Sequence, residues 1–283
     1  MFSWQLFLFA SILLTSINGL FHRVVMKTEN SNPIAQTVAF ATLAGLFAFL
    51  ISLYQGFHLP NFSLFLPNII FMVILLTLAP LCTFRAYQLT EASEVGILLS
   101  SQRLWTVIAS FIFLGETPTV FKIAGTVFIL AGVSITSWKK HKIRFTQGEI
   151  FALIAALLYG LSFVNAFYIL RSYDAPSFEV LCNILPVIVL LVCYPKVTKK
   201  MKFYLNVRNF MGVSFAALFD ALAAICLYIA YQYGRNASQI APLSATSLVI
   251  TVIFASVFLK ERKNLPQKII GACVVIAGVI FLL

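Results

Sequence analysis

The chain has 283 residues, of which 61% are hydrophobic and 10% are charged, and its 20 Lys and Arg against 9 Asp and Glu give a net charge of +11. A soluble domain cannot cover that much apolar surface, so the composition excludes a soluble globular protein. The basic residues are scattered over short connections that would face lipid headgroups, and this placement excludes nucleic-acid binding as the reason for the charge.

Apolar runs of about 20 residues, each long enough to cross a bilayer as a helix, follow one another along the chain. The longest connection between them, 196–208, leaves no room for a soluble catalytic domain. The runs also lack the alternating pattern of a barrel strand. We therefore predict an all-α integral membrane protein with ten transmembrane helices at 3–21, 34–54, 67–84, 95–114, 121–138, 148–168, 178–195, 209–231, 240–259 and 267–283.

The second half of the chain repeats the first. Residues 82–133 match 226–279 in three blocks, at shifts of 144, 145 and 146 residues. Matched pairs include Tyr87 with Tyr231, Ser93 with Ser238, Glu116 with Glu261, and Gly132 with Gly278. Two homologous halves with an odd number of spans must cross the membrane in opposite senses, as in secondary transporters that bind solute near the midplane between the repeats. We expect five-helix repeats at 1–138 and 148–283, joined by a basic loop at 139–147.

The Lys and Arg residues fall mostly on one side of the predicted membrane. Sixteen of the 20 lie on the side that holds the loops after the odd-numbered spans. Three lie on the side that carries both termini, and Arg103 lies deep inside a span. Positively charged loops stay in the cytoplasm. The sequence therefore predicts a multi-pass protein of the plasma membrane, the inner membrane in a bacterium, with both termini outside the cytoplasm.

Short motifs repeated in both halves resemble a known signature. Phe-Leu-Gly-Glu at 113–116 and Phe-Leu-Lys-Glu at 258–261, followed by Ala-Gly-Val at 131–133 and 277–279, resemble the drug/metabolite transporter superfamily, and more narrowly its EamA-type ten-span transporters. The resemblance covers nearly the whole chain. It implies an exporter of small solutes, such as amino acids or other metabolites, with a central cavity and, in most relatives, cytoplasmic termini.

Two charged residues, Arg103 and Asp220, fall near the middle of predicted spans. Each would cost on the order of 2.5–3.5 kcal/mol if it faced lipid, so we predict that both point inward. One interpretation is a fixed ion pair between them that only holds the halves together. The other is that Arg103 binds a carboxylate or phosphate of the solute, while Asp220 binds an amine or couples transport to a proton.

Further polar residues follow one face of four predicted spans, which indicates a shared cavity. The alternative is hydrogen bonding between helices, worth ~0.6 kcal/mol for each contact. Besides Arg103 and Asp220, the candidate substrate-binding residues are Thr15, Asn18, Gln102, Trp105, Tyr159, Ser162, Ser247 and Thr251.

Glycines recur seven residues apart in the fifth and tenth spans, as Gly125 with Gly132 and Gly271 with Gly278. Small residues at this spacing let two helices approach closely. We expect these faces to pack against one another, with a homodimer through them as a further expectation.

The patterns together favour a secondary transporter that exports a small polar or zwitterionic metabolite, such as an amino acid, by alternating access. The sequence contains no nucleophile with a base, no cofactor fingerprint and no metal-ligand spacing, so we expect neither an enzyme nor a bound cofactor. Two alternatives stay open: a non-transporting membrane partner subunit, and an intramembrane enzyme.

The charge distribution generates a prediction about orientation. A reporter fused after Leu283 should be active if it is a phosphatase that works only outside the cytoplasm, and dark if it is a fluorescent protein that folds only inside. The opposite pattern would place the termini in the cytoplasm, as in most relatives.

Overall fold

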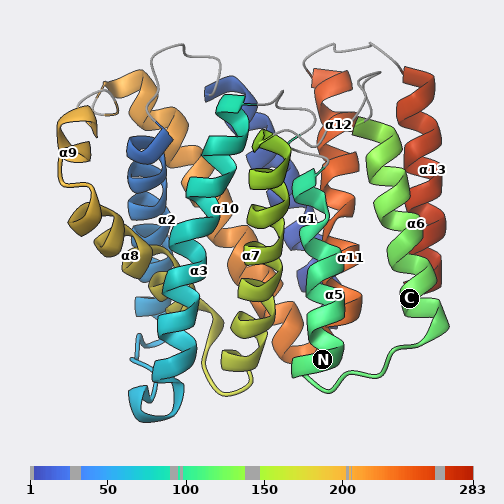
Figure 1. Ribbon diagram of the computed structural model, residues 1–283, viewed down its shortest axis with the longest axis horizontal. Helices are drawn as coiled ribbons and strands as arrows, with labels where there is room; N and C mark the ends of the chain where they lie inside the picture. Colours follow the sequence, from blue (N-terminus) through green and yellow to red (C-terminus); the bar gives the residue numbers. More distant parts are fainter. Residues whose placement is uncertain are drawn as a thin grey trace. The chain divides into compact units, whose positions relative to one another are not determined.

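The computed structural model describes residues 3–25, 33–89, 95, 98–137, 147–201, 204, 206–258 and 265–282, and residues 139–146 of the predicted connecting loop lie outside them. Every element in this part of the chain is a helix (Figure 1). The helices are α1 (Trp4–Val25), α2 (Pro33–Gln55), α3 (Phe62–Leu89), α5 (Gln102–Phe113), α6 (Val120–Ser137), α7 (Gln147–Ile169), α8 (Ala175–Cys193), α9 (Val197–Lys200), α10 (Val207–Gly234), α11 (Ala237–Ser244), α12 (Thr246–Phe258) and α13 (Leu265–Leu282).

Each of the ten predicted spans overlaps one of these helices, apart from the ninth, which is divided between α11 and α12, and the fourth overlaps α5 only from Gln102 onward. Apolar stretches of 19 to 26 residues, long enough to cross a bilayer, occur in α2, α3, α7, α8 and α10. The apolar parts of α1, α5, α6 and α13 are shorter within the described residues. The all-α, multi-span fold class predicted from the sequence is confirmed.

The chain forms two compact units, and each unit takes helices from both repeats. Unit 1 contains Met1–Thr77 and Ile169–Tyr233, and unit 2 contains Leu78–Tyr168 and Gly234–Leu283. In unit 1, α2 packs along α8, and in unit 2, α6 packs along α13 (Figure 1). The helices α2 and α8 are the second spans of the two repeats, and α6 and α13 are the fifth spans. Each unit is therefore centred on a pair of equivalent helices.

Small residues hold the helices of unit 1 close together. Ala44 and Ala48 of α2 are fully buried in one cluster with Ala217 and Ala221 of α10. At Gly45, a Cβ atom would come within 2.7 Å of the Ile184 side chain on α8. Helices in lipid gain stability mainly from such close van der Waals packing, because the lipid itself is as apolar as the side chains.

The glycines of unit 2 pack α6 against α13, as the sequence predicts. A Cβ atom at Gly132 would meet the Gly271 carbonyl oxygen at 2.7 Å, and one at Gly125 would meet the Gly278 carbonyl oxygen at 2.9 Å. Backbone therefore touches backbone at two levels. This packing uses the glycine faces within one chain, and the association of two copies stays a prediction.

The ninth span is interrupted at Ala245, whose N–H donates to the Pro242 carbonyl at 2.9 Å. Proline cannot donate a backbone hydrogen bond and disturbs the helix around it. In the fourth span, Ser101, one residue after the equivalent position Ser100, is also a turn residue, and its hydroxyl donates to the Leu98 carbonyl at 2.6 Å. Interrupted helices at matching places in two repeats are typical of secondary transporters.

Glu116, the acid of the repeated motif, caps a helix in unit 2. It follows Gly115, whose φ of 69° is a conformation that favours glycine. The Glu116 carboxylate accepts hydrogen bonds from the N–H groups of Ala237 at 2.6 Å and Ser238 at 2.9 Å, and from the Ser238 hydroxyl. Because the first N–H groups of a helix lack partners within it, this contact fixes the start of α11.

The α6–α13 packing predicts that Gly132→Val destabilises the protein by roughly 1–3 kcal/mol, because its Cβ would press on the backbone of Gly271 and Val275. Unfolding of the purified protein in detergent micelles measures the effect. Ala131→Val is the control, since Ala131 is exposed beside Gly132. Equal losses in the two variants would contradict close packing at Gly132.

Candidate functional site

Two of the predicted site residues meet inside unit 1. The side-chain amide of Asn18, on α1, donates to Oδ1 of Asp220, on α10, at 2.9 Å. Two turns earlier on α1, the Ser11 hydroxyl donates to the Ala223 carbonyl at 2.8 Å. Ser11 and Asn18 are both buried. The contact joins a helix of the first repeat to a helix of the second.

A second buried acid, Glu179 on α8, lies near Asp220. Its side chain is 3% exposed, and the Asn183 amide, one turn further along α8, donates to Oε1 at 2.6 Å. The residues that follow them, Val180 on α8 and Ala221 on α10, belong to one buried cluster, so the two acids lie beside the same packed contact. Asp220 and Glu179 therefore form one acidic pair, held by an amide on each side.

The sequence prediction missed Glu179 because it began the seventh span at residue 178 and left this acid at its end. In the structure, α8 begins earlier, since Asp174 accepts from the Ser177 N–H at 2.9 Å and caps the helix. Glu179 is therefore inside the helix. The spacing of Glu179 and Asn183, four residues apart among apolar neighbours, was the signal that could have found the pair.

The acidic pair has aromatic and sulfur-containing neighbours. The ring of Tyr228 meets that of Phe178 edge to face, with centroids 5.3 Å apart, and the Tyr228 side chain is close enough to be affected by both carboxylates. Cys182 Sγ lies 3.5 Å from Met72 Sδ. These surroundings have a low dielectric constant, so they strengthen the interaction of the carboxylates with any ligand charge.

In unit 2, three predicted site residues lie at the start of α5. Gln102 and Arg103 are half-buried and directly follow the turn at Ser101, and Trp105 is 37% exposed. The helix packs closely on α7, where a Cβ atom at Gly160 would meet the Trp105 Cβ at 2.6 Å. The Arg103 side chain makes no ion pair or hydrogen bond with the described residues of this unit.

The remaining candidates have different surroundings. On α12, the Ser247 hydroxyl donates to the Ser244 carbonyl and the Thr251 hydroxyl to the Ser247 carbonyl, both at 2.8 Å. On α7, Ser162 is buried and Tyr159 is half-buried. On α1, Thr15 is exposed, unlike Ser11 and Asn18. A cavity lined by all four stripes stays a prediction.

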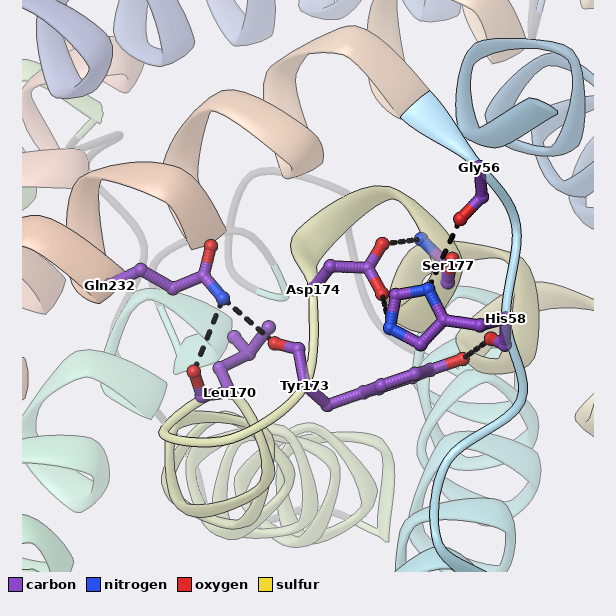
Figure 2. Close-up of polar contacts among 7 residues, drawn as sticks. All are labelled: Gly56, His58, Leu170, Tyr173, Asp174, Ser177 and Gln232. Carbon is purple, nitrogen blue, oxygen red and sulfur yellow. Dashed lines mark hydrogen bonds and ion pairs between the residues drawn. The ribbon is translucent and has the colours of Figure 1, made fainter. Parts of the chain in front are cut away.

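A polar cluster at one end of unit 1 ties loops together (Figure 2). The Tyr173 hydroxyl donates to the His58 carbonyl at 2.7 Å, which joins the loop before α8 to the loop after α2. His58 Nε2 lies 2.9 Å from Asp174 Oδ1, at ion-pair distance but not aligned as a hydrogen bond. Gln232, near the end of α10, donates to the carbonyls of Leu170 and Tyr173.

This loop cluster positions the acidic pair indirectly. Asp174 is both the cap of α8 and the partner of His58, so the contacts in Figure 2 fix where the helix that carries Glu179 begins. Burial, and then the nearby Asp174 charge, raise the pKa of Tyr173 well above its usual value. Tyr173 therefore stays a hydrogen-bond donor to His58 across the physiological pH range.

Known proteins resemble this chain in sequence and in fold. The model of the EamA-like transporter family matches residues 2–138 and again residues 146–283. A solved structure described only as "Crystal structure of protein" is similar over 98% of this chain and 95% of its own, with a TM-score of 0.77 and 17% sequence identity. At that identity, the likeness shows a shared fold alone. No curated protein matches the sequence.

The Asn18–Asp220 contact predicts that Asn18→Ala destabilises the protein by roughly 1–3 kcal/mol, because it leaves a half-buried carboxylate without its donor. Unfolding in detergent micelles measures the loss. Ser52→Ala is the control, since Ser52 is also buried in unit 1 but bonds only to its own helix, at the Phe49 carbonyl. A loss no larger than that of the control would show that the contact is not made.

Proposed function

Because the chain belongs to the EamA-like transporter family, whose members are membrane transporters rather than enzymes, we propose that it is a secondary transporter of a small polar or zwitterionic metabolite, such as an amino acid. The observation that carries this proposal is the acidic pair of the half-buried Asp220 and the buried Glu179 on two membrane-spanning helices of unit 1. Ionisable residues inside a membrane protein are costly and usually mark the path of a solute or an ion.

Asp220 would take up an amine of the solute, or a proton that couples its movement. The amide bond from Asn18 supports this role, because it joins the two repeats at the carboxylate itself. A ligand that bound at this carboxylate would therefore contact helices of both repeats.

Arg103 would take up an anionic group, either a carboxylate or a phosphate. It stands in the first turn of α5, where the helix dipole adds positive potential to its guanidinium. It also has no ion-pair partner among the described residues of unit 2, so its charge is available for a ligand. Gln102 and Trp105 would contact the same ligand group from the same helix.

Alternating access and export are the mechanism and direction that we propose. The interruptions at Ser101 and Ala245 support alternating access, because such breaks let part of a helix move and expose backbone groups to a solute. Export follows from the resemblance to EamA-type exporters. The plasma membrane as the location, and termini outside the cytoplasm, complete the proposal.

A non-transporting partner subunit is the alternative function. Such a protein would need the helices but not the acidic pair, since replacing buried charged groups by apolar residues is often neutral or stabilising. Transport measurements separate the two functions.

Proteoliposomes that contain the purified protein should take up labelled amino acids faster than empty liposomes. Loss of one charge-assisted hydrogen bond corresponds to roughly 10- to 100-fold weaker binding, so Asp220→Asn and Arg103→Gln should each reduce uptake by about that factor. Arg85→Gln, which changes an exposed arginine of α3, should transport normally.

Two outcomes would contradict this proposal. Uptake equal to that of empty liposomes, over a broad set of labelled metabolites, would favour the partner subunit. Wild-type uptake by a folded double variant, Asp220→Asn with Arg103→Gln, would show that both charges serve only the architecture.

A further inference from the structure

We propose that Asn18, Glu179 and Asp220 form a binding site for a primary ammonium group. The inference rests on the proposed function, since it gives the amine of a transported solute its place in the protein. All three residues belong to unit 1, and each comes from a different helix: α1, α8 and α10. The site therefore stands within one compact unit.

The cluster has more acceptors than donors. Each carboxylate has two acceptor oxygens, and the two amides supply one donor contact each: Asn18 to Asp220 Oδ1 at 2.9 Å, and Asn183 to Glu179 Oε1 at 2.6 Å. One oxygen of each carboxylate receives no side-chain donor from the described residues. A ligand that donates several hydrogen bonds would fill this deficit.

Asn18 shows the deficit independently of the acids. Its side chain is 6% exposed, and its Oδ1 atom is buried without a hydrogen-bond partner among the described residues. Exchanging the amide oxygen and nitrogen would not help, because it would set an oxygen against the Asp220 carboxylate. The orphaned acceptor belongs to the same amide that contacts Asp220, so it lies beside the acidic pair. A buried acceptor of this kind costs free energy until a donor reaches it.

No positive side chain neutralises the acidic pair within the described part of unit 1. His58 lies at ion-pair distance from Asp174, but this contact belongs to the loop cluster. Neither Glu179 nor Asp220 is in ion-pair distance of a described Lys, Arg or His side chain of this unit. The buried carboxylate of Glu179 and the half-buried one of Asp220 therefore lack a counter-charge from the described part of unit 1, and a cationic ligand would supply it.

The number of acceptor groups favours an ammonium over other cations. A primary ammonium carries three N–H donors, which match two carboxylates and one amide oxygen. Mg²⁺ and Ca²⁺ take six or more oxygen ligands, and the described residues contain no group of three or more His, Cys, Asp or Glu side chains placed to hold a metal. A proton on either carboxyl would offset charge and supply a single O–H donor, whereas three acceptor atoms of the cluster lack a side-chain donor from the described residues: Asn18 Oδ1 and one oxygen of each carboxylate.

Aromatic rings add a further contribution. The ring of Tyr228 packs edge to face on Phe178, the residue before Glu179, with centroids 5.3 Å apart. An ammonium near the face of a tyrosine ring gains cation–π attraction, which strengthens when water is excluded. The aromatic pair therefore suits an organic ammonium bound beside the carboxylates.

The test measures thermal unfolding of the purified full-length protein in detergent micelles, with methylammonium chloride as the probe. A ligand that binds only the folded state raises the unfolding temperature in a saturable way. We expect a rise of several degrees with methylammonium, and no saturable rise with tetramethylammonium chloride or sodium chloride at the same ionic strength. Tetramethylammonium carries the same charge but has no N–H donor.

Variants locate the site. Glu179→Gln and Asp220→Asn should abolish the saturable rise, and Asn18→Ala should shift its midpoint to about tenfold higher methylammonium, as expected for one lost hydrogen bond. Glu149→Gln is the control, because Glu149 is another buried acid but belongs to α7 in unit 2, and it should respond like the wild type.

Several outcomes would overturn the proposal. Equal rises with methylammonium, tetramethylammonium and sodium would show a general salt effect, and this comparison needs no variant to fold. An unchanged response in both acid variants would place the ammonium elsewhere. Uptake by proteoliposomes without any methylammonium effect would refute this site while leaving the transporter intact, whereas a site-specific effect without uptake would support the site and contradict transport.

Discussion

Inside a membrane protein, every buried polar group needs a partner from the protein itself, because lipid offers none, and this constraint governs the side-chain contacts of the chain. Serine and threonine hydroxyls donate to backbone carbonyls about one helical turn earlier in the chain, as at Ser247 and Thr251. The Glu116 carboxylate accepts hydrogen bonds from the first N–H groups of α11, which have no partner within the helix. Against this background the exceptions are informative. Among the described residues, Asn18 Oδ1 is one of several buried side-chain atoms without a hydrogen-bond partner, and the Arg103 side chain has no partner within its unit.

The repeats are interleaved rather than separate. Equivalent helices pair with one another, α2 with α8 in unit 1 and α6 with α13 in unit 2, so each compact unit contains a part of both repeats. Glycine and alanine at these contacts let the helices approach until backbone touches backbone. The Asn18–Asp220 bond uses the same arrangement, since it joins the first helix of one repeat to the third span of the other.

The sequence was sufficient to predict the helices and their repetition, because both follow from local hydropathy and from matched residues. It also identified the glycine faces of α6 and α13, since glycine spacing along a helix reports which face approaches a neighbour. The kink near Pro242 was predictable from the chemistry of proline. No proline stands in the fourth span near the turn at Ser101, so no single residue there indicates it.

The site was less predictable because it depends on contacts between distant segments. Nothing local shows that Glu179 lies near Asp220, or that Asp174 caps α8 while it contacts His58, 116 residues earlier. The spacing assigned Thr15 to the same polar stripe as Asn18, but in the structure Thr15 is exposed and Asn18 is buried. The role of Glu116 as a cap was also invisible, since the sequence shows the repeated motif without its partner.

The central claim is that the chain moves a solute by alternating access, and exchange across the membrane tests it most directly. Proteoliposomes are loaded with an unlabelled amino acid mixture and diluted into the same mixture in labelled form. An alternating-access transporter should draw label inside faster than proteoliposomes without internal solute do, because the returning site carries solute outward. Label that enters at the same rate with and without internal solute, or at the rate of empty liposomes, would contradict the account.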